Sequence, residues 1–302
     1  ADGPDYCGTV ELATLELPGD LFGRIDQDVE MLQAGFTGGL KKRRRNVNKG
    51  SFGHVLVVGG DERMAGAVRL AGEAALRSGA GLVSIATRAS NAFAINSARP
   101  ELMVQGVDGP QSIAPMLERA SVVALGPGLG QGAWGHALWD STVRAGKPLV
   151  LDADGLNLLA AYPYPLRAPC VLTPHPGEAA RLLGCDVARI QSDRFAAARE
   201  LAARYSAIVV LKGTGSLISN AQGRLALCPF GNPGMASAGM GDVLTGVIAG
   251  LLAQGLDAWD AACLGVLAHA QAGDRAAGEF PRGLVASDLL QPLRVYLNGA
   301  SE

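Results

Sequence analysis

An alternation of short apolar runs with helix-compatible segments is the feature of this sequence that most constrains its fold. Each run is rich in valine, leucine or isoleucine and ends in a polar or glycine-rich loop; the runs start at His54, Leu82, Val122, Pro148, Cys170 and Ala207. Helix-compatible segments, including 66–79 and 193–205, separate several of them. Successive strand–helix units predict an α/β fold with a central, mostly parallel sheet flanked by helices on both faces.

The loops that end these runs have a predictable place in such a fold. Ligands of open parallel sheets bind beyond the carboxyl ends of the strands. Because every one of these loops follows a strand, we expect the loops to converge on one crevice. Functional residues are therefore sought there.

The segment after Ala207 predicts a different local structure. SLISNAQGRLAL has a turn centred on Ala221 and Gln222 between two apolar runs, which indicates a hairpin at the sheet edge. Two helix-length segments follow, 243–254 and 259–277. Their many alanines and glycines would let these helices pack closely.

Composition and charge exclude several classes of protein. With 302 residues and 48% hydrophobic content, the chain can bury a sizeable core. The 26 basic and 28 acidic residues nearly balance, so there is no overall attraction to nucleic acid or to an anionic membrane. Five scattered cysteines without a C-x-x-C pair favour neither a disulfide framework nor a zinc site. The first residues do not read as a signal peptide, and Asp257 and Asp260 break the longest apolar run, so we expect a soluble, cytoplasmic protein.

The composition changes near residue 50. KKRRRNVNKGSFG contains five consecutive basic residues without interleaved aromatics, which favours a solvated linker over a nucleic-acid contact. Residues 1–40 hold too few apolar side chains for a domain, and 7–22 reads as a last strand and its exit. We predict a closing segment of an upstream domain over 1–40, a basic linker over 41–50 and the α/β domain over 51–302.

The loop GNPGMASAGMGD, residues 231–242, is the strongest functional signal. It runs into an uncharged segment of helix length, so its N–H groups and the helix dipole would bind an anion such as a phosphoryl group. Asp242 beside that site would repel phosphate as a mere ligand, but it could take a proton from an attacking hydroxyl. The alternative interpretation is a tight turn capped by an aspartate.

Two strand-end loops carry acids or a histidine. Asp152 and Asp154 follow one strand and precede a helix; one could cap that helix and the other face the crevice, and we favour capping. His175 lies in a stiff turn between two prolines, which favours a ligand contact. Glu178 could steer a hydrated Mg²⁺ or simply stabilise the start of its helix.

Two further loops are glycine-rich. GPGLG, residues 126–130, lets the backbone approach a ligand, although it lacks the Walker and dinucleotide-binding patterns. LKGTGS, residues 211–216, places Lys212 at a strand end and suits the phosphate and ribose of a nucleotide, or an ordinary turn with a solvated lysine.

Taken in order, these motifs resemble one family. KGSFGHVLVVGG, MAGAVRLAGEAALRSGAGLV, GPGLG, LDADGLNLLA, LTPHPGEAARLLG, VLKGTGS and GNPGMASAGMGDVLTGVIAGLL are similar to motifs of the ribokinase-like, ADP-dependent NAD(P)H-hydrate dehydratases, over about residues 49–292. The first forty residues resemble the closing strand of the NAD(P)H-hydrate epimerase domain that bifunctional members carry upstream. Ala238 departs from the family, which commonly has glycine there.

The resemblance implies a reaction. A hydrate of NADH or NADPH carries a hydroxyl at C6 of its nicotinamide ring; Asp242 would deprotonate it, the oxygen would attack the terminal phosphorus of ADP, and phosphate would then leave. The implied hydrate contacts are Ala67, Gly128, Gly130, His175 and Asp242. The implied nucleotide contacts are Lys212, Gly213, Thr214, Gly215, Ser216, Gly239 and Gly241.

The resemblance also bears on metal, assembly and rival functions. Glu178 matches the acid of the N-x-x-E element that organises Mg²⁺ in ribokinase-like kinases, but His175 replaces the asparagine, so a water-mediated Mg²⁺ at Glu178 is only one reading. The family implies a tetramer and a fused epimerase domain, with no nucleic-acid or membrane partner. The nearer rival is a kinase of the same fold acting on a hydroxymethylpyrimidine, thiazole or pyridoxal alcohol; a non-catalytic nucleotide sensor or a nucleic-acid binder is more distant.

Overall fold

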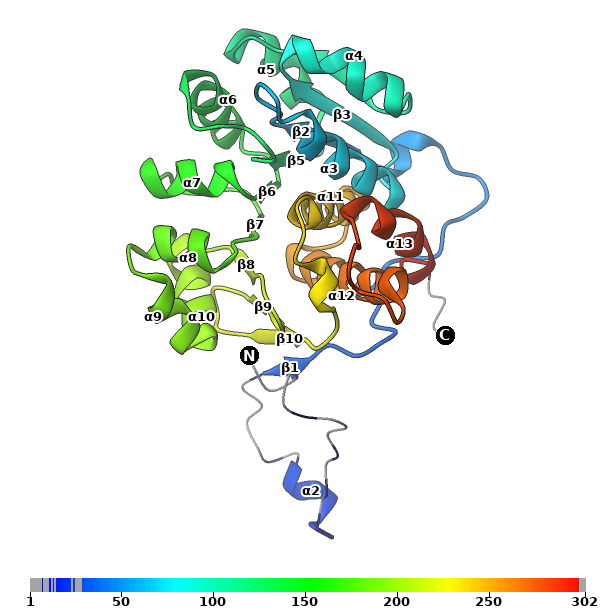
Figure 1. The fold of residues 1–302 in the computed structure, drawn as a ribbon, viewed down its shortest axis with the longest axis vertical. Helices are drawn as coiled ribbons and strands as arrows, with labels where there is room; N and C mark the ends of the chain where they lie inside the picture. Colours follow the sequence, from blue (N-terminus) through cyan, green and yellow to red (C-terminus); the bar gives the residue numbers. More distant parts are fainter. Residues whose placement is uncertain are drawn as a thin grey trace.

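Ten strands form one sheet in the order β1-β10-β9-β8-β7-β6-β5-β2-β3-β4 (Figure 1). The computed structural model describes residues 7, 11, 13, 15–22, 24 and 29–298. The strands are β1 (Glu30–Met31), β2 (His54–Val58), β3 (Leu82–Thr87), β4 (Met103–Gly106), β5 (Val122–Leu125), β6 (Leu149–Leu151), β7 (Cys170–Leu172), β8 (Ile208–Leu211), β9 (Ser216–Ser219) and β10 (Leu225–Cys228). Within this sheet only β9 runs against its neighbours, so the predicted mostly parallel α/β sheet is confirmed.

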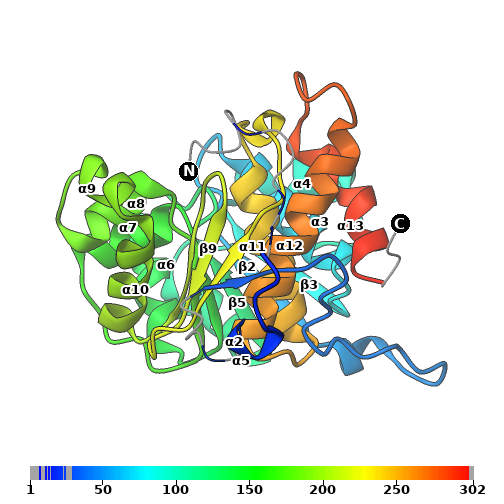
Figure 2. The same ribbon diagram turned by 90° about the horizontal axis from the view of Figure 1, so that it is seen from below.

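Helices cover both faces of the sheet (Figures 1 and 2). The helices of the described residues are α2 (Gly19–Phe22), which does not cover the sheet, α3 (Ala65–Arg77), α4 (Ala89–Ala98), α5 (Pro110–Arg119), α6 (Ala133–Arg144), α7 (Asp154–Ala161), α8 (Pro176–Leu183), α9 (Val187–Ser192), α10 (Arg194–Tyr205), α11 (Met240–Ala253), α12 (Ala258–Ala277) and α13 (Leu290–Tyr296). Short 3-10 turns lie at Lys49–Phe52, Pro233–Met235 and Ala286–Leu289. Helices α3, α11, α12 and α13 bury their apolar faces on one side of the sheet, and α5 to α10 bury theirs on the other.

Side-chain alternation along the strands divides the core into two clusters. Successive strand residues point to opposite faces, and β2 follows this rule. Val55 and Val57 pack under α3 and α11, whereas Leu56 and Val58 belong to the cluster under α5 and α6. All four are fully buried, which is why the run is continuously apolar.

Helices α3 and α11 approach each other at small residues. A Cβ placed on Gly246 would lie 2.0 Å from the Ala71 carbonyl oxygen, and one on Gly250 would lie 2.9 Å from the Ala75 oxygen. Between the two later helices, a Cβ on Gly265 of α12 would lie 2.7 Å from Ile248 Cγ1 of α11, so the expectation that their glycines and alanines permit close packing is confirmed. This packing fixes the start of α11 over the carboxyl ends of β5 and β6.

The hairpin of β9 and β10 is confirmed, but its expected edge position is wrong. Strand β1 pairs in parallel with β10, through Glu30 with Ala226 and Met31 with Leu227, and so forms the edge. Leu32 directly after β1 is 3% exposed and belongs to the core. Strand β1 could not be expected from the sequence because its two residues are too few to show a strand pattern.

The N-terminal segments only partly fall within the described residues. The predicted closing strand over 7–22 includes positions outside them, and the described part holds the single helical turn α2. Arg43 of the basic run donates to the Gly79 carbonyl oxygen and lies over the Phe52 ring. The division of the chain at residues 40 and 50 remains a prediction. Among the described helices, none is both long and apolar enough to cross a membrane.

Candidate active site

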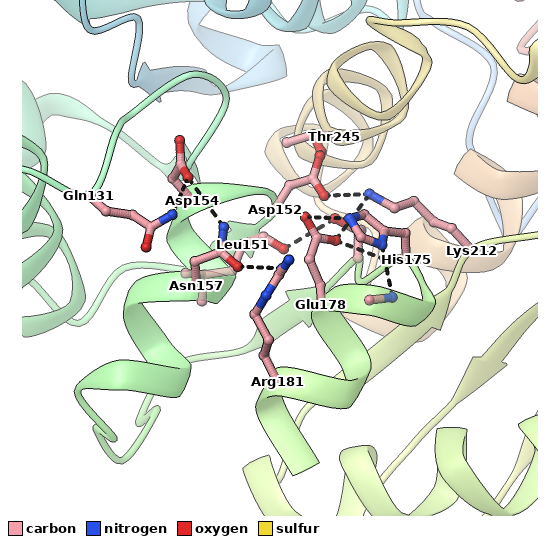
Figure 3. A network of polar contacts seen from close by, with 12 residues as sticks. Gln131, Leu151, Asp152, Asp154, Asn157, His175, Glu178, Arg181, Lys212 and Thr245 are labelled. Atoms are coloured by element: carbon pink, nitrogen blue, oxygen red, sulfur yellow. Dashed lines mark hydrogen bonds and ion pairs between the residues drawn. The ribbon is translucent and has the colours of Figure 1, made fainter. Parts of the chain in front are cut away.

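An ion pair at the carboxyl ends of β6 and β8 forms the centre of the candidate site (Figure 3). Asp152 follows β6 and is 2% exposed, and its Oδ1 lies 2.6 Å from Nζ of Lys212, the first residue after β8. Its Oδ2 accepts a 2.9 Å hydrogen bond from Oγ1 of Thr245 on α11. Burial by itself would raise the pKa of Asp152, but the Lys212 ammonium and hydrogen bonds from Lys212, Thr245 and Thr173 lower it below the ordinary value. Asp152 is therefore a fixed anion, held by groups from three elements.

Glu178 on α8 lies on the other side of the same lysine. Its Oε2 is 3.8 Å from Lys212 Nζ and accepts a 2.8 Å hydrogen bond from the His175 N–H. Burial raises the pKa of Glu178, the Lys212 ammonium opposes that shift, and the nearby Asp152 carboxylate adds to it. Both carboxylates thus share one ammonium group.

His175 is the N-terminal cap of α8. Its Nδ1 accepts a 3.0 Å hydrogen bond from the Gly177 N–H, and Nε2 lies 3.5 Å from Glu178 Oε1. The side chain is 51% exposed, so it can still meet a ligand. Pro176 at the first helical position suits this cap because it has no N–H to satisfy.

Helix α11 begins beside this ion pair. Gly239 has a left-handed backbone, at φ 89°, and no side chain caps the helix. The first backbone hydrogen bond of the helix joins the Val243 N–H to the Gly239 carbonyl, so the three preceding N–H groups are left for a ligand. A Cβ on Gly241 would lie 3.3 Å from both Asp152 Oδ2 and Lys212 Nζ, which shows how closely the helix approaches the pair.

Asp242 lies on the first turn of α11, and its pKa is raised well above the ordinary value. Burial, with the Asp152 carboxylate as a smaller cause, raises the pKa of Asp242 to about 7, while the Lys212 ammonium lowers it. A carboxylate with a pKa near neutrality can accept a proton and release it again at working pH. The interpretation of Asp242 as a turn cap is wrong, since α11 has no side-chain cap.

The GPGLG loop carries two predicted contacts, of which Gly128 approaches helix α3. Gly128 has φ 55°, and a Cβ there would lie 3.3 Å from the Ala67 Cβ. Gly130 donates its N–H to Asp154 Oδ2 at 2.9 Å. Asp154 also accepts from Gln131 and Asn157 side chains, at 3.2 Å each (Figure 3). This network joins the loop to α7.

The predicted capping role of Asp152 or Asp154 is wrong. Helix α7 has Ala153 as its N-terminal cap position and no side-chain capping bond. The reason is competition, because the oxygens of Asp152 are taken by Lys212 and Thr245, and those of Asp154 by the GPGLG loop and Asn157.

The LKGTGS loop carries the predicted nucleotide contacts. Gly213 and Gly215 have φ of 146° and 64°, which require glycine. Thr214 is exposed, and Ser216 Oγ donates to the Gly213 carbonyl at 3.1 Å. Ala238, the departure from the family glycine, is exposed and does not have a positive φ, so alanine is accommodated there without strain.

The structure thus gathers Asp242, Gly241, Lys212, His175 and Glu178 around one ion pair. Ala67 with Gly128, and Gly130 with Asp154, form a second group along the neighbouring loop. Sequence reasoning missed the pairing role of Asp152 and missed Thr245. Thr245 lies three residues after Asp242, one helical turn along the same face, which is the signal that could have found it.

The described residues contain no group of three or more His, Cys, Asp and Glu side chains that could hold a metal ion. Glu178 has one oxygen engaged by the His175 N–H and lies near an ammonium. The donor set therefore does not fit a direct protein cage for Mg²⁺. It fits a hydrated ion held through water, with substrate phosphates as its main ligands.

The open, mostly parallel sheet with an acid at the uncapped start of a helix is shared with ribokinase-like proteins. A ribokinase-like superfamily protein from Enterococcus faecalis has the same fold, with a TM-score of 0.83, 28% identity, and 90% of this chain and 96% of that chain covered. Residues 55–294 match the model of the NAD(P)H-hydrate dehydratases. The chain belongs to the NAD(P)H-hydrate dehydratase family, a family of enzymes.

Two further relatives make the comparison specific. An ADP/ATP-dependent NAD(P)H-hydrate dehydratase from Bacillus subtilis, co-crystallized with ATP/Mg²⁺, gives a TM-score of 0.82 and 33% identity over 90% of this chain and 98% of that chain. The bifunctional NAD(P)H-hydrate repair enzyme of Coxiella burnetii is 48% identical over 297 residues, 98% of this chain and 61% of its own length. The chain spans between 50% and 61% of the length of the first curated relatives that it matches.

Proposed function

We propose that this chain catalyses the ADP-dependent dehydration of NADH hydrate and NADPH hydrate, and that Asp242 is its catalytic base. The observation that carries the proposal is an aspartate with a pKa of about 7 at the uncapped start of α11. Family membership supports the substrate class, and similarity to the ADP/ATP-dependent enzyme of Bacillus subtilis supports use of a nucleoside phosphate.

The reaction would run in two steps. Asp242 takes the proton of the C6 hydroxyl, and the oxygen forms a bond to the terminal phosphorus of ADP as the bond to the AMP oxygen breaks. The free N–H groups of α11 and the Lys212 ammonium stabilise the charge on the phosphoryl oxygens. The lone pair of the ring nitrogen then expels phosphate from C6 and leaves a ring iminium ion, and loss of a proton from C5 forms the C5=C6 double bond of the reduced ring. The products are NADH or NADPH, AMP, phosphate and a proton.

The remaining predicted contacts would position the two substrates. We assign the hydrate contacts to Ala67, Gly128 and Gly130 of the second group and to His175, which lies near the ion pair. The loop 212–216, with Gly239 and Gly241, would hold the nucleotide. Mg²⁺, when bound, would neutralise phosphate charge, with Glu178 holding it through water.

A direct assay tests the proposal. Hydrated NADH, ADP and Mg²⁺ are mixed with the protein, and the return of reduced-nicotinamide absorbance is followed while AMP and phosphate are quantified. We expect one AMP and one phosphate for each NADH formed. A phosphorylated hydrate or other phosphate ester that accumulates without NADH would favour the kinase of the same fold.

We also propose that the chain is part of a longer, bifunctional protein. The relatives named bifunctional support a fusion of this dehydratase to an upstream epimerase domain, of which residues 1–40 would be the closing segment. The mass of the endogenous protein tests this, because a fusion would be much heavier than 31.0 kDa. The tetramer and the cytoplasmic location remain predictions.

A further inference from the structure

Arg194, the first residue of α10, is a buried cation held by backbone carbonyls. The residue is 8% exposed. Its Nη1 donates to the Thr214 oxygen at 2.5 Å, and its Nη2 donates to the oxygens of Leu211 and Lys212 at 3.3 and 3.4 Å. Within the described part of the chain, no carboxylate forms an ion pair with Arg194, and its buried Nε has no hydrogen-bond partner.

Burial of the Arg194 guanidinium costs free energy unless other groups compensate its charge. A buried cation is ordinarily paired with an anion, and carbonyl dipoles compensate it only in part. Burial accordingly lowers the pKa of Arg194, although a guanidinium remains charged at neutral pH. The fixed positive charge lies directly behind the LKGTGS loop.

Two of the three carbonyls that Arg194 contacts belong to peptide groups whose N–H is free among the described residues. The third, that of Leu211, shares its peptide group with the Lys212 N–H, which donates to the Pro174 oxygen. The Lys212 oxygen shares its peptide group with the Gly213 N–H, and the Thr214 oxygen shares its own with the Gly215 N–H. Neither N–H donates to a backbone or side-chain acceptor among the described residues. A hydrogen bond to a carbonyl polarises its peptide group and strengthens the donor on the other side. Arg194 therefore makes both N–H groups better donors to an anion.

The fit between Arg194 and the loop is close. A Cβ placed on Gly213 would lie 2.9 Å from Nη2 of Arg194, so a side chain there would push against the guanidinium. The φ of 146° at Gly213 is a second reason for glycine. The two residues are 19 positions apart in sequence and form one unit.

We propose that Arg194 is a positioning residue for nucleotide binding, which orients and polarises the loop 212–216 so that it receives a phosphate group. Arg194 would not touch the nucleotide itself. The inference rests on the proposed nucleotide-dependent function. The alternative hypothesis is that Arg194 only stabilises the fold, by joining α10 to the turn after β8.

Calorimetric titration with AMP and with adenosine separates these readings, because the two ligands differ only in the phosphate. For Arg194→Met we expect the Kd of AMP to rise by at least about tenfold, and that of adenosine by less than about twofold. Arg194→Lys keeps the charge without the fork and should recover part of the AMP affinity. If the methionine variant does not fold, Arg194→Gln, which keeps a hydrogen-bond donor without the charge, should show the same AMP-selective loss.

Arg189→Ala is the matched control, since this arginine of α9 is 56% exposed and pairs with Glu200. It should leave both affinities unchanged. Equal losses for AMP and adenosine, or an unchanged AMP affinity in Arg194→Met, would overturn the positioning role while the nucleotide site stands. If the unsubstituted protein bound neither ligand, the nucleotide site of the proposed function would fail, and this inference with it.

Discussion

The Nζ atom of Lys212 lies 2.6 Å from Oδ1 of Asp152, and the helix that carries Asp242 begins against this pair. Lys212 also lies 3.8 Å from Glu178, so one ammonium balances two buried carboxylates. Burial by itself would lower the pKa of Lys212, but Asp152 and Glu178 raise it above the ordinary value. The lysine thus stays charged and sets the electrostatics of the site.

Removal of that ammonium should reduce both stability and activity. In Lys212→Met the buried Asp152 loses its partner, which should lower the free energy of unfolding by about 3–5 kcal/mol. The acidic limb of the rate profile should move to higher pH, because Lys212 lowers the pKa of Asp242 in the native protein. Urea denaturation and a pH–rate profile measure the two effects. Lys212→Met combined with Asp152→Leu should restore most of the stability but not the activity, and equal denaturation midpoints for Lys212→Met and the native protein would contradict the prediction.

The rate should depend on ionisation of Asp242. Because a base must be deprotonated, kcat/KM should rise with pH through an apparent pKa near 7. Asp242→Asn should reduce the rate by about 10²- to 10⁴-fold. Retention of the native rate by this variant would show that another group accepts the proton.

Asp242 should also affect stability in a pH-dependent way. Its folded pKa of about 7 lies above the ordinary value of about 3.9, so the folded state binds more protons between these two values. Stability from this group is therefore present at low pH and is lost as the pH rises through 7. Asp242→Asn should be at least as stable as the native protein at pH 8, and the difference should shrink toward pH 5. Thermal melts at both pH values test this, and a variant less stable at pH 8 would count against it.

A methyl group at Gly241 should disturb the nucleotide side of the site. It would meet both members of the Asp152–Lys212 pair at 3.3 Å. We expect Gly241→Ala to raise the KM for ADP by roughly tenfold, since the ion pair must shift away from the helix. Gly66 is the matched control, because it is the second residue of α3 and a Cβ there meets nothing within 4 Å. Equal KM values in the two variants would refute the close approach.

A methyl group at Gly246 should instead act on stability. Its Cβ would lie 2.0 Å from the Ala71 oxygen, a backbone atom that cannot move aside without separating α3 from α11. We expect Gly246→Ala to lower the free energy of unfolding by about 1–3 kcal/mol, or more if the helices cannot separate. Urea denaturation, with Gly66→Ala again as the control, gives the measurement. An unchanged midpoint would mean that the helices can separate at no cost.

Much of the fold could be read from the sequence because its signals are local. Apolar runs such as 54–58 and 207–211 mark strands that are buried on both faces, and the residue after each run marks a strand end. The sequence patterns therefore located the loops that carry His175, Lys212 and Asp242. The edge strands β1 and β4 escaped because neither is a buried apolar run: β1 has only two residues, and β4 alternates exposed and half-buried residues.

The amino-acid sequence by itself indicated which loops form the candidate site, through strand ends, glycines and the order of motifs. Tertiary structure alone decided which side chains become partners. Asp152 and Lys212 are separated by 60 positions, and Asp152 and Thr245 by 93. Their meeting depends on which crossovers bring strand ends together, and the pKa of Asp242 depends on burial that no local pattern encodes. Local sequence decides where a chain turns. The burial of a charged group and the charges next to it are decided only when segments distant in the sequence pack together.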